Sequence, residues 1–107
     1  MQVIQVQTTF SNREDADRVG LLLVEQRLAA CVQICGPIRS VYRWQGKIET
    51  AEEWLCLVKT TQDRYPQVEQ AIIEAHPYET PEIIALPVAA GSSTYLDWLR
   101  AETLPAD

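Results

Sequence analysis

The sequence predicts one α+β domain spanning residues 1–107, in which helices cover a β-sheet. The 107 residues are 47% hydrophobic and 22% charged, which is the size and balance of a single globular domain. Strand-like and helix-like segments alternate along the chain, with no repeats and no linkers between them. A domain this small leaves much of its surface exposed, so oligomerisation is a common source of added stability.

The first part of the chain predicts a strand followed by an amphipathic helix. Residues 2–9 alternate polar and apolar side chains, as a strand with one buried face does. Ser11 is the predicted helix N-cap, because Glu14 completes a capping-box pattern three positions later. The two sides of this helix differ in polarity: Val19, Leu22, Leu23 and Leu28 are predicted to face the sheet, and Asp15, Asp17, Arg18 and Glu25 to face solvent.

A long β-hairpin is predicted in the middle of the chain. Its strands run from about Cys31 to Trp44 and from Lys47 to about Thr61, with a tight turn at Gln45–Gly46. Glycine supplies the positive φ that such turns require. Residues 54–58 are apolar at successive positions, so both faces of the second strand need to be covered.

The register of this hairpin bears on two of the three cysteines. With a two-residue turn, paired positions sum to 91, which predicts that Cys35 faces Cys56. A bulge at Gly36–Pro37 would shift this register. The two thiols are then either a pair able to take up a metal or oxidise, or two small residues of the core.

The remaining segments predict a second helix, a last strand and a C-terminal helix. The second helix starts at Thr61 or Asp63, tolerates Pro66 in its first turn and buries Val68 and Ile72. A rigid loop at 76–81 leads to a strand at 82–88, and Gly91–Ser93 leads to a short helix that carries Tyr95 and Trp98. The order βαββαβ plus a helix is the ferredoxin-like α+β plan.

The predicted hairpin is too long for one domain of this size. Strands of about 14 residues reach roughly 45 Å, whereas a chain of this length has a radius of gyration near 13 Å. The distal part carries Val41, Tyr42, Trp44 and Ile48, which are costly to leave in water. Burial against further copies of the chain in a closed cyclic assembly would cover them.

Charge and cysteine content limit the partners and the compartment. The net charge of −6 disfavours nucleic acid and anionic membranes as partners. No apolar run approaches the roughly 20 residues of a membrane span, and residues 1–6 look like a strand rather than a signal peptide. Three cysteines without a CxxC motif indicate reduced thiols, so a cytoplasmic location is expected.

Several long segments resemble the CutA divalent-cation tolerance family. The matching residues follow one another from the first strand to the last helix: Leu28–Ile34, Ser40–Lys47, Glu53, Lys59–Thr60, His76–Glu82 and Tyr95–Leu99. The resemblance implies a ferredoxin-like homotrimer, similar in architecture to the PII-type nitrogen regulators. It also implies a link to copper and other divalent metals.

The resemblance makes Cys31 and His76 the candidate metal ligands. Copper(I) prefers thiolates, and copper(II) accepts imidazole together with oxygen ligands. Each residue also has a structural alternative, since a cysteine packs well as a small apolar residue and a histidine at a helix end can bond the last carbonyls. Some family members have further cysteines, where this chain has Thr8 and Ile73.

A second group of residues is expected where subunits meet. Charged and aromatic side chains occur in segments that otherwise look buried, and the resemblance gathers them in an intersubunit cleft: Tyr42, Trp44, Glu53, Lys59, Tyr78, Glu82 and Tyr95. Such a set is either a ligand pocket or a salt-bridge network that holds the trimer together.

Three functions remain open at this point, and none of them is enzymatic. The chain has one histidine, four glycines and no motif for nucleophilic, phosphate or zinc chemistry. The first hypothesis is a trimer that binds copper or similar ions weakly through Cys31 and His76, with no obligatory cofactor. The second is a PII-like signalling trimer that binds a small molecule, and the third is a ligand-free structural or anchoring trimer.

Overall fold

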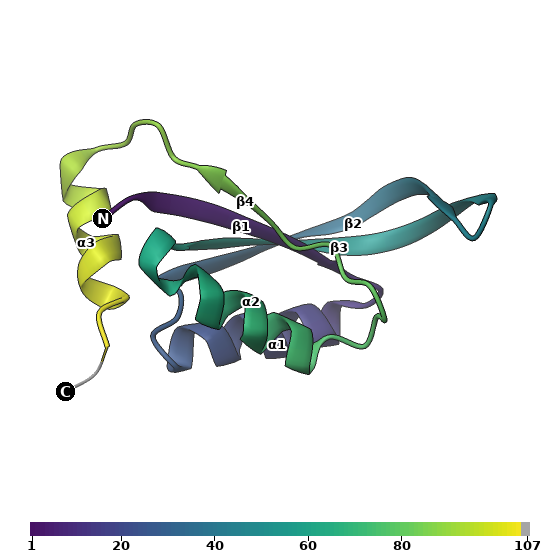
Figure 1. The fold of residues 1–107 in the computed structure, drawn as a ribbon, viewed down its shortest axis with the longest axis horizontal. Helices are drawn as coiled ribbons and strands as arrows, with labels where there is room; N and C mark the ends of the chain where they lie inside the picture. Colours follow the sequence, from purple (N-terminus) through teal and green to yellow (C-terminus); the bar gives the residue numbers. More distant parts are fainter. Residues whose placement is uncertain (106–107) are drawn as a thin grey trace.

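The computed structural model describes residues 1–105, so Ala106 and Asp107, which the single-domain prediction includes, lie outside the described residues. Four strands form one antiparallel sheet in the order β2-β3-β1-β4. The strands are β1 (Val3–Phe10), β2 (Cys31–Trp44), β3 (Lys47–Thr61) and β4 (Ile84–Pro87). The helices are α1 (Arg13–Glu25), α2 (Tyr65–Ala75) and α3 (Ser93–Glu102). The element order and sheet confirm the predicted α+β plan (Figure 1).

The two long helices lie side by side on one face of the sheet, and α3 lies at one end (Figure 1). Between sheet and helices is a continuous apolar core of aliphatic side chains around one aromatic ring: Ile4, Val6, Phe10, Val19, Leu23, Val58, Val68 and Ile72. Both helix faces predicted to be buried therefore reach the core. The opposite face of the sheet carries no helix in residues 1–105.

The ends of the elements differ from the predicted ones where tertiary pairing extends or shortens a strand. Strand β1 runs on to Phe10, so the N-cap of α1 is Asn12 instead of Ser11. The Asn12 Oδ1 atom accepts a hydrogen bond from the Asp15 N–H at 2.8 Å. Thr61 is the last residue of β3, paired with Val3, and α2 begins at Tyr65, so neither predicted start of the second helix, Thr61 or Asp63, was right.

The second helix and the last strand are both shorter than predicted. A short 3₁₀ turn at Gln62–Arg64 precedes α2, and Pro66 lies in the first turn as expected. Strand β4 covers Ile84–Pro87 instead of 82–88, because it pairs only with Ile4–Gln7 of β1.

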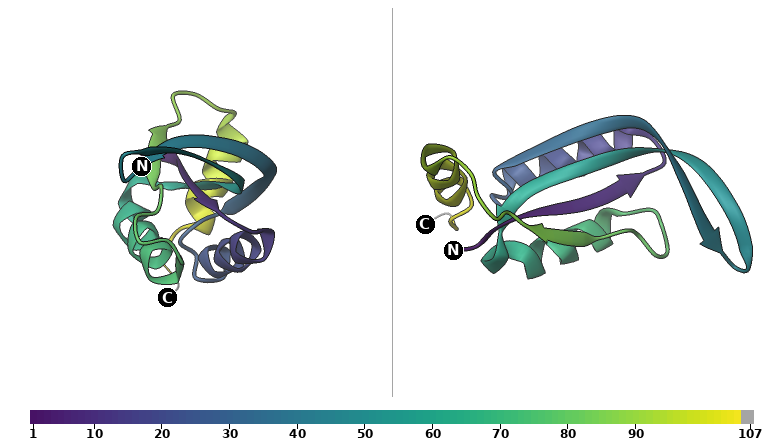
Figure 2. Two further views of the ribbon diagram at one scale, coloured as in Figure 1. Left: turned by 90° about the vertical axis from the view of Figure 1, so that its right-hand side faces the viewer. Right: turned by 90° about the horizontal axis from the view of Figure 1, so that it is seen from above.

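The hairpin of β2 and β3 has the predicted ends and extends beyond the helices. The longest dimension of the molecule is 45 Å, and the ribbon curves away from the sheet at its far end (Figure 2). Val41 and Ile48 are about two-thirds exposed, and Tyr42 and Trp44 are also exposed. No other part of residues 1–105 covers this end of the hairpin.

A bulge between Cys35 and Ile38 sets the register of the hairpin. From the turn to Ile38, paired positions sum to 91, but beyond the bulge Cys35 pairs with Leu55 and Ile34 with Cys56. The prediction that Cys35 faces Cys56 was therefore wrong, because the bulge places one extra residue in β2. Cys56 is buried in the core and Cys35 is exposed, so the two thiols lie on opposite faces.

The bulge also decides which face of the hairpin carries its aromatic residues. Two residues that are directly paired across a hairpin lie on the same face of the sheet. Cys35 therefore shares the face of Leu55, and Ile38 shares the face of Glu53. Because β3 continues without interruption, Tyr42 and Trp44 lie on the same face as Leu55 and Leu57. In a regular strand they would lie on the helix-covered face instead.

We predict that Gly36→Ala destabilises the fold by about 1–3 kcal/mol, because a Cβ atom would overpack the bulge. That atom would stand 2.5 Å from Cδ1 of the Trp54 indole, which packs on the core and cannot easily shift. Urea unfolding measures the loss. In a Trp54→Ala background the same change should cost little, and an equal cost in both backgrounds would contradict the explanation.

Candidate functional site

The predicted site residues are dispersed over separate places in one chain. Glu53 and Tyr78 meet where β1 ends and the hairpin leaves the sheet. Lys59 lies nearer the other end of β3, opposite Cys31. Tyr95 lies on α3, with its ring centroid 5.6 Å from that of Trp98. Of the other predicted cleft residues, Tyr42 and Trp44 lie on the distal hairpin, and Glu82 is exposed in the loop before β4.

The buried carboxylate of Glu53 is the main feature of the first place. The residue is only 7% exposed, and its Oε2 atom accepts a hydrogen bond from the Tyr78 hydroxyl at 2.8 Å. Its neighbour across the hairpin is Ile38, which has no polar side chain. Among residues 1–105, the three ion pairs all lie on helices, so no cation is within 4.0 Å of this carboxylate.

The Tyr78 hydroxyl stays protonated throughout the physiological pH range. Burial is the first cause that raises the pKa of Tyr78 to about 12, and the hydrogen bond to Glu53 is the second. A protonated phenol donates one hydrogen bond and carries no charge. Tyr78 therefore satisfies part of the hydrogen-bonding capacity of Glu53 without neutralising it.

His76 holds the loop that carries Tyr78. Its ring stacks on Phe10 with centroids 4.2 Å apart. The Nε2 atom is 2.7 Å from the carbonyl oxygen of Thr9, and the Nδ1 atom is 3.1 Å from the backbone nitrogen of Tyr78. A carbonyl can only accept and an N–H can only donate, so Nε2 carries the proton and Nδ1 accepts.

These contacts define what His76 does in the folded chain. It ends α2, but its side chain bonds Thr9 and Tyr78 rather than the last helix carbonyls. Both ring nitrogens are occupied, so binding a metal would require one of these bonds to break. Thr9 pairs with Leu55 and Cys31 pairs with Lys59, four residues apart on β3 or about 13 Å. One metal ion cannot contact His76 and Cys31 of the same chain.

Lys59 and Cys31 form the second place, on the face of the sheet that no helix covers. The Lys59 ammonium donates a hydrogen bond to Oε1 of Gln33 at 3.0 Å. The Cys31 thiol is half-buried, and Cys35 lies on the same face two residues beyond Gln33. Among residues 1–105, no group of three or more histidine, cysteine or acidic side chains is close enough to hold a metal ion.

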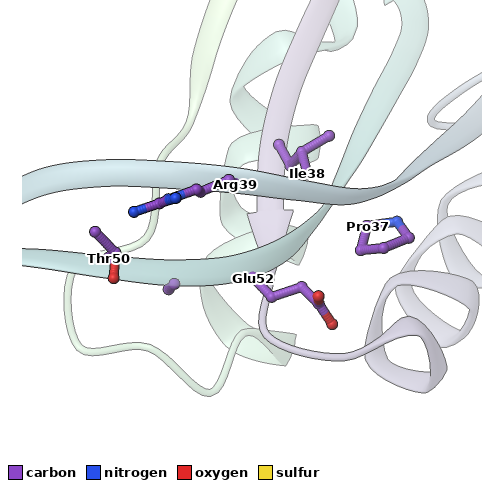
Figure 3. Close-up of a pocket in the computed structure, with 6 residues that line it drawn as sticks. Pro37, Ile38, Arg39, Thr50 and Glu52 are labelled. Atoms are coloured by element: carbon purple, nitrogen blue, oxygen red, sulfur yellow. The ribbon is translucent and has the colours of Figure 1, made fainter.

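A hollow at the root of the hairpin adds a feature that the sequence did not indicate. It has a volume of about 310 Å³ and is lined by Pro37, Ile38, Arg39, Thr50, Ala51 and Glu52. In Figure 3, Ile38 and Glu52 point to opposite sides of the ribbon. None of the predicted site residues lines it. Only the bulge at Gly36–Pro37 could have suggested a hollow at this point of the sequence.

We predict that stability falls as the pH drops from 7.5 to 5.5, because His76 is buried in its neutral form. Burial is the main cause that lowers the pKa of His76 below its ordinary value of 6.5. The unfolded chain then binds more protons than the folded chain as the pH falls through about 6.5, so unfolding is favoured. Urea unfolding at both pH values measures the change.

His76 is the only histidine, so His76→Gln provides the matched control. This variant should lose most of the pH dependence in that window. An equal slope in wild type and variant would contradict the assignment.

Comparison with known sequences shows that this chain is similar to divalent-cation tolerance proteins. A divalent-cation tolerance protein CutA from Thermus thermophilus is 47% identical over 95 residues, covering 89% of this chain and 92% of that protein. The human Protein CutA is 42% identical over 95 residues. This match covers 89% of the present chain but about half of the human protein, 53%.

Solved structures agree with the sequence comparison. The structure of the divalent cation tolerance protein Cut A1 from Thermus thermophilus superimposes with a TM-score of 0.93 at 46% identity, covering 94% of this chain and 98% of that chain. A CutA from Archaeoglobus fulgidus, described as periplasmic, superimposes with a TM-score of 0.92 at 36% identity, covering 95% of this chain and 99% of that chain.

None of the helices in residues 1–105 is long and apolar enough to cross a bilayer.

The match to the family itself extends over nearly all of the described fold, from β1 to the end of α3. It covers residues 4–102, which include the hairpin, the Glu53–Tyr78 contact and His76. The family description names tolerance to divalent ions. The chain therefore belongs to the CutA1 divalent ion tolerance protein family.

Proposed function

We propose that this protein acts in divalent-cation tolerance as a homotrimer, without catalysing a reaction. The observation that carries the proposal is the uncovered face of the sheet, called here the open face. It carries Cys31, Cys35, Leu55, Leu57, Lys59, Ile84 and Leu86, together with the glutamines between them. Ile84 and Leu86 are 48% and 44% exposed, and an apolar surface of this kind is typical of a protein interface.

The hairpin supplies a second apolar surface that differs from the first. Tyr42 and Trp44 project from its distal part on the same side as the open face. A contact of a hairpin on a neighbour's open face joins two different surfaces, so it is heterologous. Where each copy gives its hairpin to one neighbour and receives the hairpin of another, three copies form the smallest closed ring. This favours a trimer.

Metal binding in this proposal takes ligands from more than one copy. Cys31 fits a soft cation such as copper(I), since its half-buried thiol lies on the open face where copies meet. His76 fits less well, because both of its ring nitrogens are hydrogen-bonded. We therefore propose Cys31 as the first contact for copper and His76 as a contact that requires rearrangement of its loop.

The state of the thiols supports a reducing compartment such as the cytoplasm. All three cysteines are free, and Cys56 packs in the core with its pKa raised to about 11 by burial. A thiol in this state is unreactive and a poor metal ligand. Cys31 and Cys35 therefore remain as the accessible thiols of the chain.

The assembly is tested by Leu57→Lys, which places a charge in the open face. We expect wild type to sediment with the mass of three 12.1 kDa chains and Leu57→Lys to shift to smaller species. Leu21→Lys is the matched control, because Leu21 is 62% exposed on the outer side of α1 and should leave the mass unchanged. A wild-type monomer at micromolar concentration would refute the proposal.

Copper uptake is tested on the two accessible thiols. Titration of copper(I) into wild type and Cys31→Ser should show uptake that is lost in the variant, whereas Cys35→Ser should retain it. Sedimentation with and without copper shows whether the metal changes the assembly. Identical isotherms for wild type and Cys31→Ser would remove Cys31 as a ligand.

A further inference from the structure

The Glu53 residue is more than nine-tenths buried, and within residues 1–105 no cation lies within 4.0 Å of its carboxylate. A buried charge is costly unless it is paired, and here Tyr78 offers a single uncharged donor. His76 cannot help, because its protonated nitrogen is directed to Thr9. One carboxylate oxygen of Glu53 therefore has no donor within residues 1–105, and it is not fully enclosed, so a group from outside the chain can reach it.

The hairpin of the same chain carries cations without acidic partners at its tip. Lys47 is exposed and paired with Trp44, and Arg43 is paired with Ile48. Neither takes part in an ion pair in the part of the chain that the structure describes. Lys47 is six residues from Glu53 along β3, or about 20 Å, so it cannot reach the carboxylate of its own chain.

The basic residues of β2 and β3 lie on two different faces of the hairpin. Lys47 and Lys59 are the basic residues on the same face as Glu53, whereas Arg39 and Arg43 lie on the opposite face. Lys59 already donates to Gln33. An approach of one copy's hairpin to the open face of another thus leaves Lys47 as the cation that faces Glu53.

We propose that Lys47 at the hairpin tip of one copy completes the Glu53–Tyr78 site of the next copy. This inference rests on the proposed homotrimer and adds the residue that each neighbour contributes. The ammonium group binds the carboxylate oxygen that Tyr78 leaves free, and Trp44 beside it excludes water. The pair positions the hairpin on its neighbour, and repetition around the ring uses every tip and every site once.

The test is a double-mutant cycle with Lys47→Met and Glu53→Gln, read as the dissociation constant of the oligomer in sedimentation. Each single change should weaken the assembly on the order of 100-fold, and the double variant should be no weaker than the worse single variant. Arg43→Met is the matched control, because its effect should simply add to that of Glu53→Gln. An additive Lys47–Glu53 cycle would overturn the inference.

Methylammonium chloride distinguishes a neighbour's lysine from a free cation. Relative to sodium chloride, it should restore the assembly of Lys47→Met, but not that of the double variant. Equal stabilisation of wild type would show that Glu53 binds a free cation instead, which overturns the inference. The comparison of wild type with Lys47→Met needs no substitution at Glu53 and so holds even if Glu53→Gln folds poorly.

Sedimentation also separates this inference from the proposed function. A stable trimer with an additive cycle would leave the proposed assembly intact and exclude the Lys47–Glu53 contact. A wild-type monomer would refute both.

Discussion

The pairing of β2 with β3 is the interaction on which the rest of the molecule depends. It builds the edge of the sheet, forms the projecting hairpin and fixes which residues meet across it. The bulge between Cys35 and Ile38 is its key irregularity, since a shift of one residue exchanges the two faces of a strand. Without it, Tyr42 and Trp44 would face the helix side, away from Leu55 and Leu57.

The two faces of the sheet have different roles, because helices cover only one of them. The helix-covered face closes the core, where each fully buried aliphatic or aromatic side chain contributes about 1.5–3 kcal/mol. The open face keeps Leu55, Leu57, Ile84 and Leu86 available for another copy. A fold stabilised by one face alone can present the other as an interface, and this division connects the architecture with the proposed trimer.

The site chemistry depends on the place where β1 stops and the hairpin continues. Phe10 and Thr9 hold the ring of His76, and His76 in turn fixes the backbone of Tyr78. Tyr78 then reaches Glu53 on β3, 25 residues away in sequence. His76 therefore acts as a positioning residue in the folded chain, while the Cys31 thiol lies on the open face at a distance from it.

The sequence by itself determined the element order, the ends of the long hairpin and the residues of the core. These features follow from local rules: side-chain periodicity, the positive φ of Gly46 and the helix-breaking segment at 76–81. The family motifs likewise pointed to Glu53, Tyr78 and His76, but not to how they are arranged. Local patterns carry no information on which distant side chains meet.

Only the tertiary structure decided the strand register, the separation of Cys35 from Cys56 and the bonding of His76. The bulge depends on how Gly36 packs against Trp54, which lies across the hairpin. The N-cap moved to Asn12 because β1 is extended to Phe10 by pairing with β3. Only the tertiary structure shows that Glu53 is buried with Tyr78 as its one hydrogen-bond donor. The partners of a charged group are set by distance in space and not by distance along the sequence.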